Sequence, residues 1–379
     1  MQVNRERLAA FFTELCSIES FSRNEGKVAQ YLQHHFSKLG ADAILMDESA
    51  AATGSDCGNL VIRLKGDADV NDPLFFACHM DTVGPAKGIE VQRSGDIFTS
   101  KGDTILGADD KSGIAPLLEL VSLLKEHSVR HCPVELVFTT CEEIGLMGAK
   151  ALDTSLIQAQ YGYALDSSRQ GKIITGAPAA NRLKITVRGR AAHSGLDPEA
   201  GINALAVAAK AINHITLGRV DSLSTTNFGL ISGGTASNIV PELIVLEGEV
   251  RSHSPEMLKK HTLEITDIFE RVAAEWPAAG EENHPRVMIE TQEDFPVMRL
   301  EDNDPVLRRI QSATTLVGRP MAFDIAGGGS DANIFSARGL PTAIIPTGMS
   351  KVHSTEEQVD LNDMVELTEL LLALVTDQT

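Results

Sequence analysis

The sequence predicts an α/β protein whose main domain is interrupted by an inserted ferredoxin-like domain. Strand-like and helix-like segments alternate over residues 1–178 and again over residues 296–379, which is typical of a sheet covered by helices. Residues 179–295 instead predict the order β-α-β-β-α-β, with alternating apolar and polar strand positions that suit a sheet with one open face. A chain of 379 residues also exceeds what one hydrophobic core usually supports, so two domains are expected.

Composition and charge narrow the class of protein. The chain is 43% hydrophobic and 22% charged, as globular proteins are, and it has no apolar run long enough to cross a membrane. Fifty-two acidic residues against thirty-three basic ones give a net charge of −19, which disfavours nucleic acid and anionic membranes as partners. The five cysteines show no CxxC pair, and the charged N-terminus lacks a signal-peptide pattern. We therefore expect a cytoplasmic protein with reduced thiols.

The first part of the main domain is predicted to begin with two helices. They cover Arg5–Cys16 and Glu25–Leu39, and Ser22 with Glu25 forms a capping-box pattern at the start of the second. The glycine-rich segment 84–107 predicts a hairpin and loop. The remaining elements are a helix at Ile114–Glu126 and strands at Ala43–Met46, Asn59–Leu64, Phe75–Cys78, Val134–Thr139 and Tyr161–Leu165.

Chemically active residues follow the buried strand that the stretch FFACHMDTV, Phe75 to Val83, predicts. His79 and Asp81 come at its carboxyl end, two positions apart, so both side chains can reach the same place. Open α/β sheets bind ligands at the carboxyl ends of their strands. On its own, however, this stretch is equally consistent with a solvated histidine and aspartate at a strand end.

Two further predicted strands end in the same way. Val134–Thr139 is followed by CEEIG, which contains Glu142 and Glu143, and Tyr161–Leu165 is followed by Asp166. Three strands that end in carboxylate or imidazole groups, within one alternation of strands and helices, indicate a single sheet. Its functional edge is expected where these strands end.

The inserted domain and the second part of the main domain complete the prediction. In residues 179–295, a strand is expected from Leu183 onward, followed by two helices and three strands. In residues 296–379, two helices flank a glycine-rich loop, AGGGSDAN, and a strand. The expected elements are the helices Glu199–Ile215, Pro255–Ala274, Pro305–Val317 and Leu361–Thr376, and the strands Thr226–Ser232, Leu243–Arg251, Arg286–Thr291 and Thr342–Ile345.

The polar residues at the predicted strand ends and loops define a candidate metal site. Carboxylate and imidazole ligands without cysteine suit zinc, manganese or cobalt in a hydrolytic site better than a structural zinc site. Each residue alone is weak support, since adjacent acidic residues are common in solvated loops. A site for two metals needs about five protein ligands, and the chain offers enough of them. The candidates are His79, Asp81, Asp109, Asp110, Glu142, Glu143, Asp166, His193 and His353.

As a set, the motifs resemble those of one family. The chain carries, in this order, HMDTV, GADDKSG, CEEIG, ALDSS, AAHSG, GGGSDAN and VHSTEE. These are similar to the motifs of the M20 family of dinuclear metallopeptidases, and within it the chain looks like the peptidase T (tripeptide aminopeptidase) branch. The resemblance covers nearly the whole chain. It implies a zinc-aminopeptidase-like catalytic domain with an inserted ferredoxin-like domain that serves as a lid and forms dimers.

The resemblance implies two divalent metal ions, zinc or alternatively manganese or cobalt. His79 and Asp166 match the ligands of the first metal, and Glu143 and His353 match those of the second. Asp109 matches the aspartate that bridges them. Five protein ligands with a shared carboxylate are what a two-metal hydrolytic site requires.

Three neighbouring carboxylates receive other roles from the same resemblance. Asp110 is a weaker candidate for the bridge than Asp109, because the family pattern places the bridging aspartate two positions before the lysine. Asp81 matches the residue that orients His79. Glu142 matches the general base, which takes a proton from a metal-bridging water and returns it to the leaving amine.

The resemblance also implies residues that bind the substrate. His193 in AAHSG matches the histidine that stabilises the tetrahedral oxyanion, in many members from the lid of a partner subunit. Asn238 and Arg251 match lid residues that hold polar groups or the carboxylate of the substrate, and an arginine can bind a carboxylate with two parallel hydrogen bonds. Gly328 and Ser330, in the glycine-rich loop, are expected to bring main-chain N–H groups to the substrate.

The implied function is metal-dependent hydrolysis of short peptides from their amino terminus, by a homodimer. One position departs from the family pattern: tripeptidases are expected to carry an arginine four positions before Asp331, where this chain has Gly327. The preferred peptide length is therefore open. So is an M20 amidohydrolase of another substrate class, an N-acyl amino-acid deacylase or a carboxypeptidase. A catalytically silent binding protein is disfavoured, because every ligand position and Glu142 are filled.

Overall fold

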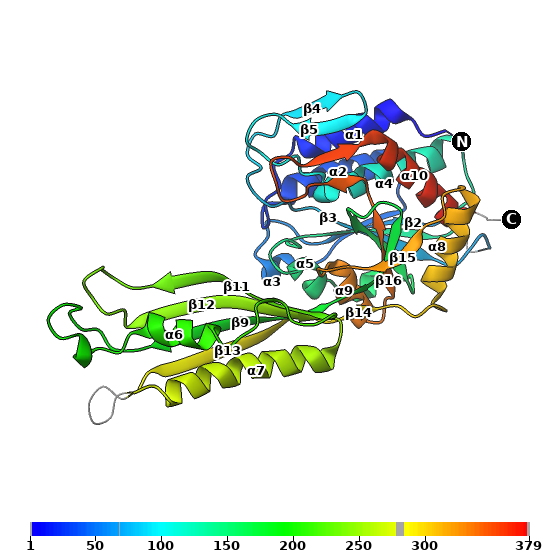
Figure 1. Cartoon of the computed structure of the whole chain (residues 1–379). Helices are drawn as coiled ribbons and strands as arrows, with labels where there is room; N and C mark the ends of the chain where they lie inside the picture. The colour runs from blue at the N-terminus through cyan, green and yellow to red at the C-terminus, as the bar shows by residue number, and fades with distance from the viewer. Residues whose placement is uncertain (1, 68, 278–283, 377–379) are drawn as a thin grey trace. The chain divides into compact units, whose positions relative to one another are not determined.

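The computed structural model describes residues 2–67, 69–277 and 284–376 of the chain (Figure 1). The chain forms two compact units. The first combines Met1–Ala177 with Met298–Thr379, and the second consists of Pro178–Val297. Each unit buries its own cluster of apolar side chains, so the protein has two separate hydrophobic cores.

A nine-stranded mixed sheet forms the centre of the first unit. Its strands are β1 (Ala43–Met46), β2 (Leu60–Leu64), β3 (Leu74–His79), β6 (Val134–Thr139), β7 (Gly162–Ser167), β8 (Lys172–Ala177), β14 (Met298–Arg299), β15 (Ala322–Ile325) and β16 (Thr342–Pro346). Neighbours follow the order β1-β2-β6-β3-β7-β16-β8-β14, and β15 pairs with β8. The adjacent strands β6, β3, β7 and β16 are parallel. Their carboxyl ends therefore meet at one edge of the sheet.

Helices cover both faces of this sheet (Figure 1). They are α1 (Arg5–Cys16), α2 (Gly26–Lys38), α3 (Ala50–Thr53), α4 (Ala108–Glu126), α5 (Met147–Ala151), α8 (Pro305–Leu316), α9 (Asp331–Ala337) and α10 (Leu361–Val375). Helix α4 packs against β3 and β7 and also contacts α1 and α10. Phe76 of β3 lies in the core around α4, whereas the ring of the adjacent Phe75 contacts Phe335 of α9 at 5.5 Å between centroids. Successive residues of β3 thus fill two buried faces.

A four-stranded sheet joins distant parts of the first unit. It consists of β4 (Val91–Ser94), β5 (Ile97–Ser100), β17 (Met349–Ser350) and β18 (Gln358–Asp360), in the order β17-β18-β5-β4. Strands β4 and β5 form the hairpin that the glycine-rich segment predicts. Because β18 pairs with β5, the C-terminal segment between β17 and β18 is held beside a hairpin from the N-terminal part of the chain.

The second unit is a sheet with two helices packed on it. Its elements are β9 (Ala179–Arg188), α6 (Ala204–Ile212), β10 (Gly218–Arg219), β11 (Ser224–Gly233), β12 (Leu243–Ser252), α7 (Pro255–Ala274) and β13 (Arg286–Phe295). All neighbouring strands are antiparallel, in the order β10-β11-β12-β9-β13. Helices α6 and α7 contact each other and the two central strands, β9 and β12. Apart from the short β10, this is the predicted ferredoxin-like arrangement.

Most expected elements are present, and the differences at their ends have local causes. Strand β9 begins at Ala179 and not at Leu183, because β12 and β13 pair with its first residues on both sides. Helix α6 begins later than expected, because the side chain of Asn203 accepts a hydrogen bond from the N–H of Ala206 and caps the helix. Strands β8 and β15 and helix α9 are additional to the prediction.

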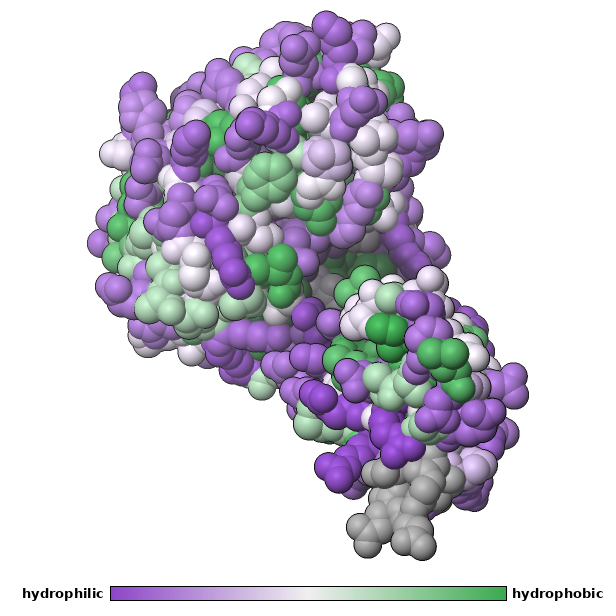
Figure 2. Space-filling model, turned by 90° about the vertical axis from the view of Figure 1, so that its left-hand side faces the viewer, coloured by the Kyte–Doolittle hydropathy of each residue, from purple (hydrophilic) through white to green (hydrophobic). Residues whose placement is uncertain are grey.

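Polar side chains predominate on one face of the molecule. The face shown in Figure 2 is largely hydrophilic, with hydrophobic residues in small groups, in agreement with the net charge of −19. In the described part of the chain, no helix combines the length and apolar character that a membrane span requires. The five cysteines are all buried and carry free thiols.

Candidate active site

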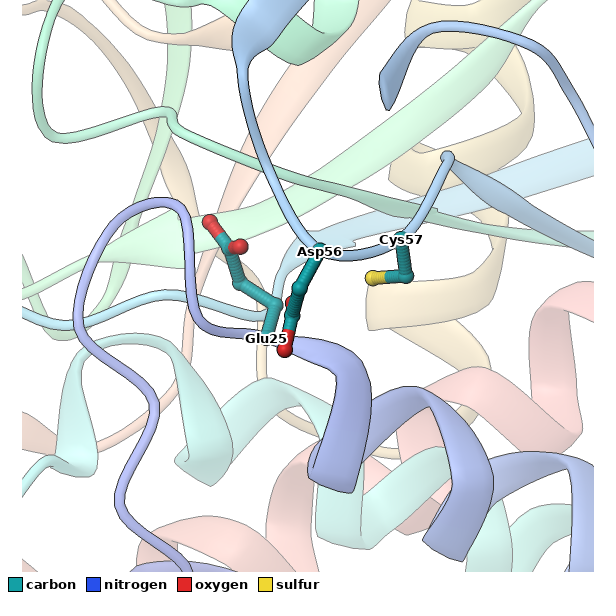
Figure 3. Close-up of side chains that lie close together, drawn as sticks. All are labelled: Glu25, Asp56 and Cys57. Carbon is teal, nitrogen blue, oxygen red and sulfur yellow. The ribbon is translucent and has the colours of Figure 1, made fainter. Parts of the chain in front are cut away.

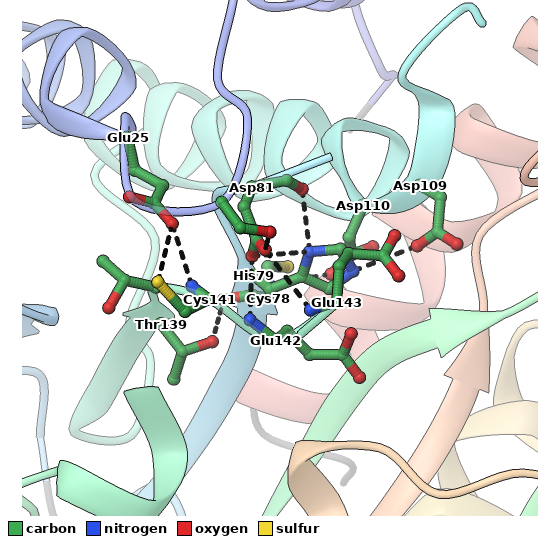
Figure 4. Close-up of polar contacts among 12 residues, drawn as sticks. Glu25, Cys78, His79, Asp81, Asp109, Asp110, Thr139, Cys141, Glu142 and Glu143 are labelled. Atoms are coloured by element: carbon green, nitrogen blue, oxygen red, sulfur yellow. Dashed lines mark hydrogen bonds and ion pairs between the residues drawn. The ribbon is translucent and has the colours of Figure 1, made fainter. Parts of the chain in front are cut away.

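The carboxyl edge of the parallel strands brings polar side chains together, as Figure 4 shows. His79 is the last residue of β3, Asp166 lies near the end of β7, and Glu142 and Glu143 follow β6. Asp109 comes from the start of α4. Regular elements rather than long loops therefore position these residues.

His79 is held in one tautomer by its neighbour. Its Nδ1 lies 2.9 Å from the main-chain carbonyl oxygen of Asp81, which can only accept a hydrogen bond. Nδ1 therefore carries the proton, and Nε2 is the nitrogen that can bind a metal. The carboxylate of Asp81 is farther away, at 3.5 Å from Nδ1. The orienting contact expected from Asp81 is thus made mainly by its main chain.

Asp109 lies between two histidines. Its Oδ1 is 3.0 Å from Nε2 of His79, and its Oδ2 is 3.2 Å from Nε2 of His353. The same nitrogen of His353 is 3.1 Å from Oε1 of Glu143. Two groups of possible metal ligands contain Asp109: His79, Asp109 and Asp166 form one, and Asp109, Glu143 and His353 form the other. The structure therefore brings the five expected ligands together in two groups that share Asp109.

The side chain of Asp110 makes different contacts from that of Asp109. Its carboxylate is buried and accepts a hydrogen bond from the main-chain N–H of His79 at 3.2 Å. Burial raises the pKa of Asp110 well above its usual range, which favours the neutral form. Asp110 thus braces the end of β3, while Asp109 carries the contacts to both histidines.

The electrostatics of the site fit bound cations. Burial and the nearby carboxylate of Asp109 raise the pKa of Asp166 well above its usual range. Burial, opposed by His79 and reinforced by Asp166, likewise raises the pKa of Glu142. Clustered buried carboxylates need protons or cations for their stability. The oxygen and nitrogen donors present here suit divalent metal ions.

A sharp turn after β6 separates the two adjacent glutamates. Cys141 has a positive φ of 52°. The carboxylate of Asp81 accepts hydrogen bonds from the N–H groups of Glu142 (3.0 Å) and Glu143 (3.3 Å), and a 2.6 Å hydrogen bond from the hydroxyl of Ser22. Asp81 thus fixes the turn, which leaves the two glutamate side chains able to serve different roles.

Figure 3 shows a second group of side chains that includes acidic residues. Glu25, Asp56 and Cys57 offer ligand atoms at metal-site spacing. However, Oε1 of Glu25 accepts a 2.9 Å hydrogen bond from the N–H of Cys141, and Oδ1 of Asp56 accepts one from the start of α2. These carboxylates therefore brace the main chain. The expected capping box is wrong, because Ser22 and Glu25 both reach the active-site turn instead.

Glu357 is a positioning residue that the sequence pattern did not reveal. It is 2% exposed, and its carboxylate accepts hydrogen bonds from the N–H groups of Leu106 (2.7 Å), Gly107 (2.7 Å) and Asp109 (3.0 Å). It thus anchors the segment that carries Asp109 to the segment that carries His353. The sequence did contain a signal for this residue, because Glu357 is the last residue of the VHSTEE motif, which also contains His353.

We expect Glu357→Gln to weaken metal binding by about 10- to 100-fold, the range for residues that support metal ligands. Glutamine replaces one accepting oxygen by an NH₂ group, which cannot accept a hydrogen bond from a main-chain N–H. Competition with a chelating dye measures the metal dissociation constants. Glu356→Gln is the control, because Glu356 is exposed and paired with Lys351. An unchanged metal affinity in folded Glu357→Gln protein would contradict this role.

A cavity of about 310 Å³ lies beside the ligand groups. Asp166 and His353 line it, as does the glycine-rich loop with Gly328 and Ser330. The N–H of Ser330 donates to Oδ1 of Asn333 at 3.0 Å, and its hydroxyl caps α9. The N–H and hydroxyl groups of Ser330 thus bond within the start of α9, and both Ser330 and Gly328 contribute to the cavity wall. Their roles toward the substrate stay predictions.

The second unit groups two of its three expected substrate-binding residues. The N–H of Ser194, next to His193, donates to the carbonyl oxygen of Asn238 at 3.0 Å. His193 and Asn238 are both exposed. Arg251 lies near the C-terminal end of β12, and its Nη2 donates to Oε2 of Glu249 at 2.9 Å. His193 and Asn238 thus lie side by side, and Arg251 lies elsewhere on the same sheet.

The fold and the site have counterparts in a known family. Residues 75–377, more than half of the chain, match peptidase family M20/M25/M40. The chain belongs to this family. The resemblance inferred from the motifs is therefore confirmed.

Individual relatives share the fold over the whole chain. Aminopeptidase PepT from Bacillus cereus is 36% identical and superposes with a TM-score of 0.89, and the match covers 99% of each chain. A tripeptidase from Staphylococcus aureus is 34% identical with a TM-score of 0.92, and the match covers 99% of this chain and 98% of that one. Protein YqjE from Bacillus subtilis is 37% identical over 376 residues, 99% of both chains. The expected fold class is thus confirmed.

Proposed function

We propose that this protein is a metal-dependent aminopeptidase that hydrolyses short peptides from their amino terminus. The observation that carries the proposal is the position of Asp109, whose two carboxylate oxygens lie 3.0 and 3.2 Å from the nitrogens of His79 and His353. A carboxylate shared by two ligand groups is the arrangement that a two-metal hydrolase needs. The relatives from Bacillus cereus and Staphylococcus aureus, an aminopeptidase and a tripeptidase by name, support the same reaction.

Two divalent cations fit the ligand set. His79 and Asp166 would hold one, Glu143 and His353 would hold the other, and Asp109 would bridge them. We propose zinc, with manganese or cobalt as alternatives, because imidazole and carboxylate donors without cysteine suit all three. When bound, the cations would polarise the scissile carbonyl and lower the pKa of the attacking water.

Glu142 is the proposed general base and general acid. It lies close to His79 and Glu143 at the edge of the ligand groups. From there it would take a proton from the attacking water and return it to the leaving amine. Burial raises the pKa of Glu142, which offsets the lowering that nearby positive charge causes. Asp81 supports this role by fixing the turn that carries Glu142.

The amino terminus of the substrate provides the test. An aminopeptidase requires a free α-amine, whereas an N-acyl amino-acid deacylase or a carboxypeptidase does not. We expect hydrolysis of trialanine with release of its first residue, and no hydrolysis of N-acetyl-trialanine, with products separated by chromatography. Faster cleavage of the acetylated peptide, or release of the last residue first, would contradict the proposal.

The proposal assigns different roles to the parts of the chain. Residues 1–178 and 296–379 form the catalytic domain, since all five ligand residues come from them. Residues 179–295 form a lid and dimerisation domain. A cytoplasmic location is supported by the five buried free thiols, which oxidising compartments would tend to convert into disulfides.

A free strand edge supports a homodimer. Within the described residues, β10 pairs with the first part of the outer edge of β11, and no strand pairs with the rest of that edge. Beyond it, Leu230 and Ile231 of β11 are 65% and 60% exposed. An uncovered strand edge with apolar side chains is a surface on which a second copy of the chain can pair.

A further inference from the structure

The cavity beside the ligand groups contains one strong cation. Among the described residues that line it, Arg169 is the single lysine or arginine. Asp109, Asp166 and His353 line the same cavity. Arg169 follows the end of β7, three positions after Asp166. A permanent positive charge thus lines the same open cavity as the groups proposed to carry out hydrolysis.

Arg169 is anchored in a way that leaves part of its guanidinium available. Its Nη1 donates to Oδ2 of Asp324 at 2.9 Å and to the carbonyl oxygen of Ile325 at 3.2 Å. The side chain is 49% exposed. Within residues 2–67, 69–277 and 284–376, these contacts engage Nη1 alone. Nε and Nη2 therefore remain able to donate to a ligand.

The adjoining glycine run leaves room for that ligand. Asp324 and Ile325 lead directly into the segment 326–330, which lines the cavity. A Cβ atom added at Gly327 would meet no atom within 4 Å. The space next to this main chain is therefore open, and a peptide can approach it without meeting a side chain.

Arg251, which the sequence suggested for the substrate carboxylate, is less available. Its Nη2 donates to Oε2 of Glu249 at 2.9 Å, and its Nε lies 2.9 Å from Oε1 of the same residue. Nε and Nη2 form the fork with which an arginine binds a carboxylate. Glu249 thus pairs with the guanidinium of Arg251 and engages its Nη2, whereas in the described part of the chain the contacts of Arg169 engage Nη1.

We propose that Arg169 binds the C-terminal carboxylate of the peptide substrate and so selects short peptides. The inference rests on the proposed aminopeptidase function, which places the first peptide bond at the ligand groups. A peptide held in the same cavity then extends from these groups to Arg169, and its carboxylate meets the guanidinium fork. A peptide too long for the cavity carries its carboxylate past Arg169 and loses this interaction.

Trialanine and its C-terminal amide test the proposal, because the C-terminal carboxylate is the one carboxylate of trialanine and the amide lacks it. Binding is measured by calorimetry to metal-loaded Glu142→Gln protein, which holds the peptide without hydrolysing it. We expect Arg169→Met to weaken binding of the free acid by about 10- to 100-fold and to change binding of the amide by less than about twofold. In the enzyme with Glu142 intact, the same substitution should raise KM for the acid and leave kcat nearly unchanged.

Three variants separate this role from a structural one. Arg169→Lys keeps the charge without the fork, so it should recover part of the affinity for the acid. Asp324→Asn breaks the ion pair and leaves Arg169 in place, so the preference for the acid over the amide should persist. Arg130→Met removes an exposed ion pair with Asp67 that is not part of the cavity lining, and it should bind both peptides as the parent does.

Two binding patterns would overturn the proposal. One is an equal effect of Arg169→Met on the acid and the amide, or equal binding of both peptides by the parent protein. The other is a selective loss of acid binding in Arg251→Met and not in Arg169→Met, which would assign the carboxylate to Arg251. Failure of the proposed function is distinguishable, because the wild-type enzyme would then release no amino-terminal residue from trialanine.

Discussion

The variant Glu142→Ala is expected to lower kcat by about 10²- to 10⁴-fold and to retain two metal ions per chain. Glu142 is assigned to proton transfer, while the five residues of the two groups that share Asp109 supply the ligands. Removing its carboxylate therefore deprives the attacking water of a base and leaves the ligands in place. Steady-state kinetics with a tripeptide and elemental analysis of the same preparation measure the two effects.

The adjacent variant Glu143→Ala is the matched control. Oε1 of Glu143 lies 3.1 Å from Nε2 of His353 within one ligand group, so its loss should release one of the two ions. Glu142→Gln, which keeps the size of the side chain, should behave as Glu142→Ala does. An exchange of phenotypes between the two alanine variants would reverse the roles within the pair. A maximum of one ion per chain in the saturated wild-type protein would contradict the two-metal site.

Replacing His193 by alanine is expected to lower kcat by about 10²- to 10³-fold, with little change in metal content or thermal stability. Nδ1 of His193 accepts a hydrogen bond from the N–H of Gly195 at 3.2 Å, so in the neutral ring Nε2 carries the proton and can donate to an oxyanion. The side chain is exposed, and exposed residues contribute little to stability. A lower melting temperature with an unchanged kcat would contradict the catalytic role.

Mixing two inactive variants tests whether His193 acts across a dimer. The resemblance to the family implies that the histidine matching His193 acts, in many members, from the lid of a partner subunit. We therefore expect His193 to serve the active site of a partner subunit. A heterodimer of His193→Ala and Glu142→Ala chains then carries one site with both residues intact, so subunit exchange should restore part of the activity. No recovery after verified exchange would exclude this arrangement.

The parallel strands and their polar ends could be predicted because both signals are local. Strands β3, β6 and β7 are buried apolar runs, and His79, Glu143 and Asp166 come at or just after their ends. Asp109 and His353 lie outside such runs. Periodicity alone does not mark them, and they were assigned from the resemblance to the family.

Contacts between distant residues could not be predicted from local patterns. Glu357 and Gly107 are 250 positions apart, and the hydrogen bond between them depends on the packing of the whole unit. Ser22 is a case in which a local pattern misleads. The sequence predicts a capping box there, but the hydroxyl of Ser22 donates to Asp81, 59 positions away. Helix α9 is absent from the prediction, because its seven residues are too few to display a helical period.

The hydrogen bonds that Glu357 accepts have a consequence for biosynthesis. At about 5–20 residues per second, a ribosome adds His353 and Glu357 on the order of ten to sixty seconds after His79. A nascent chain therefore presents His79, Asp109 and Asp166 well before the second ligand group exists. Until His353 has been added, the nascent polypeptide therefore contains all the residues of one proposed ligand group only. If the protein binds two ions as proposed, the second ion can bind once residues 353–357 have been synthesised.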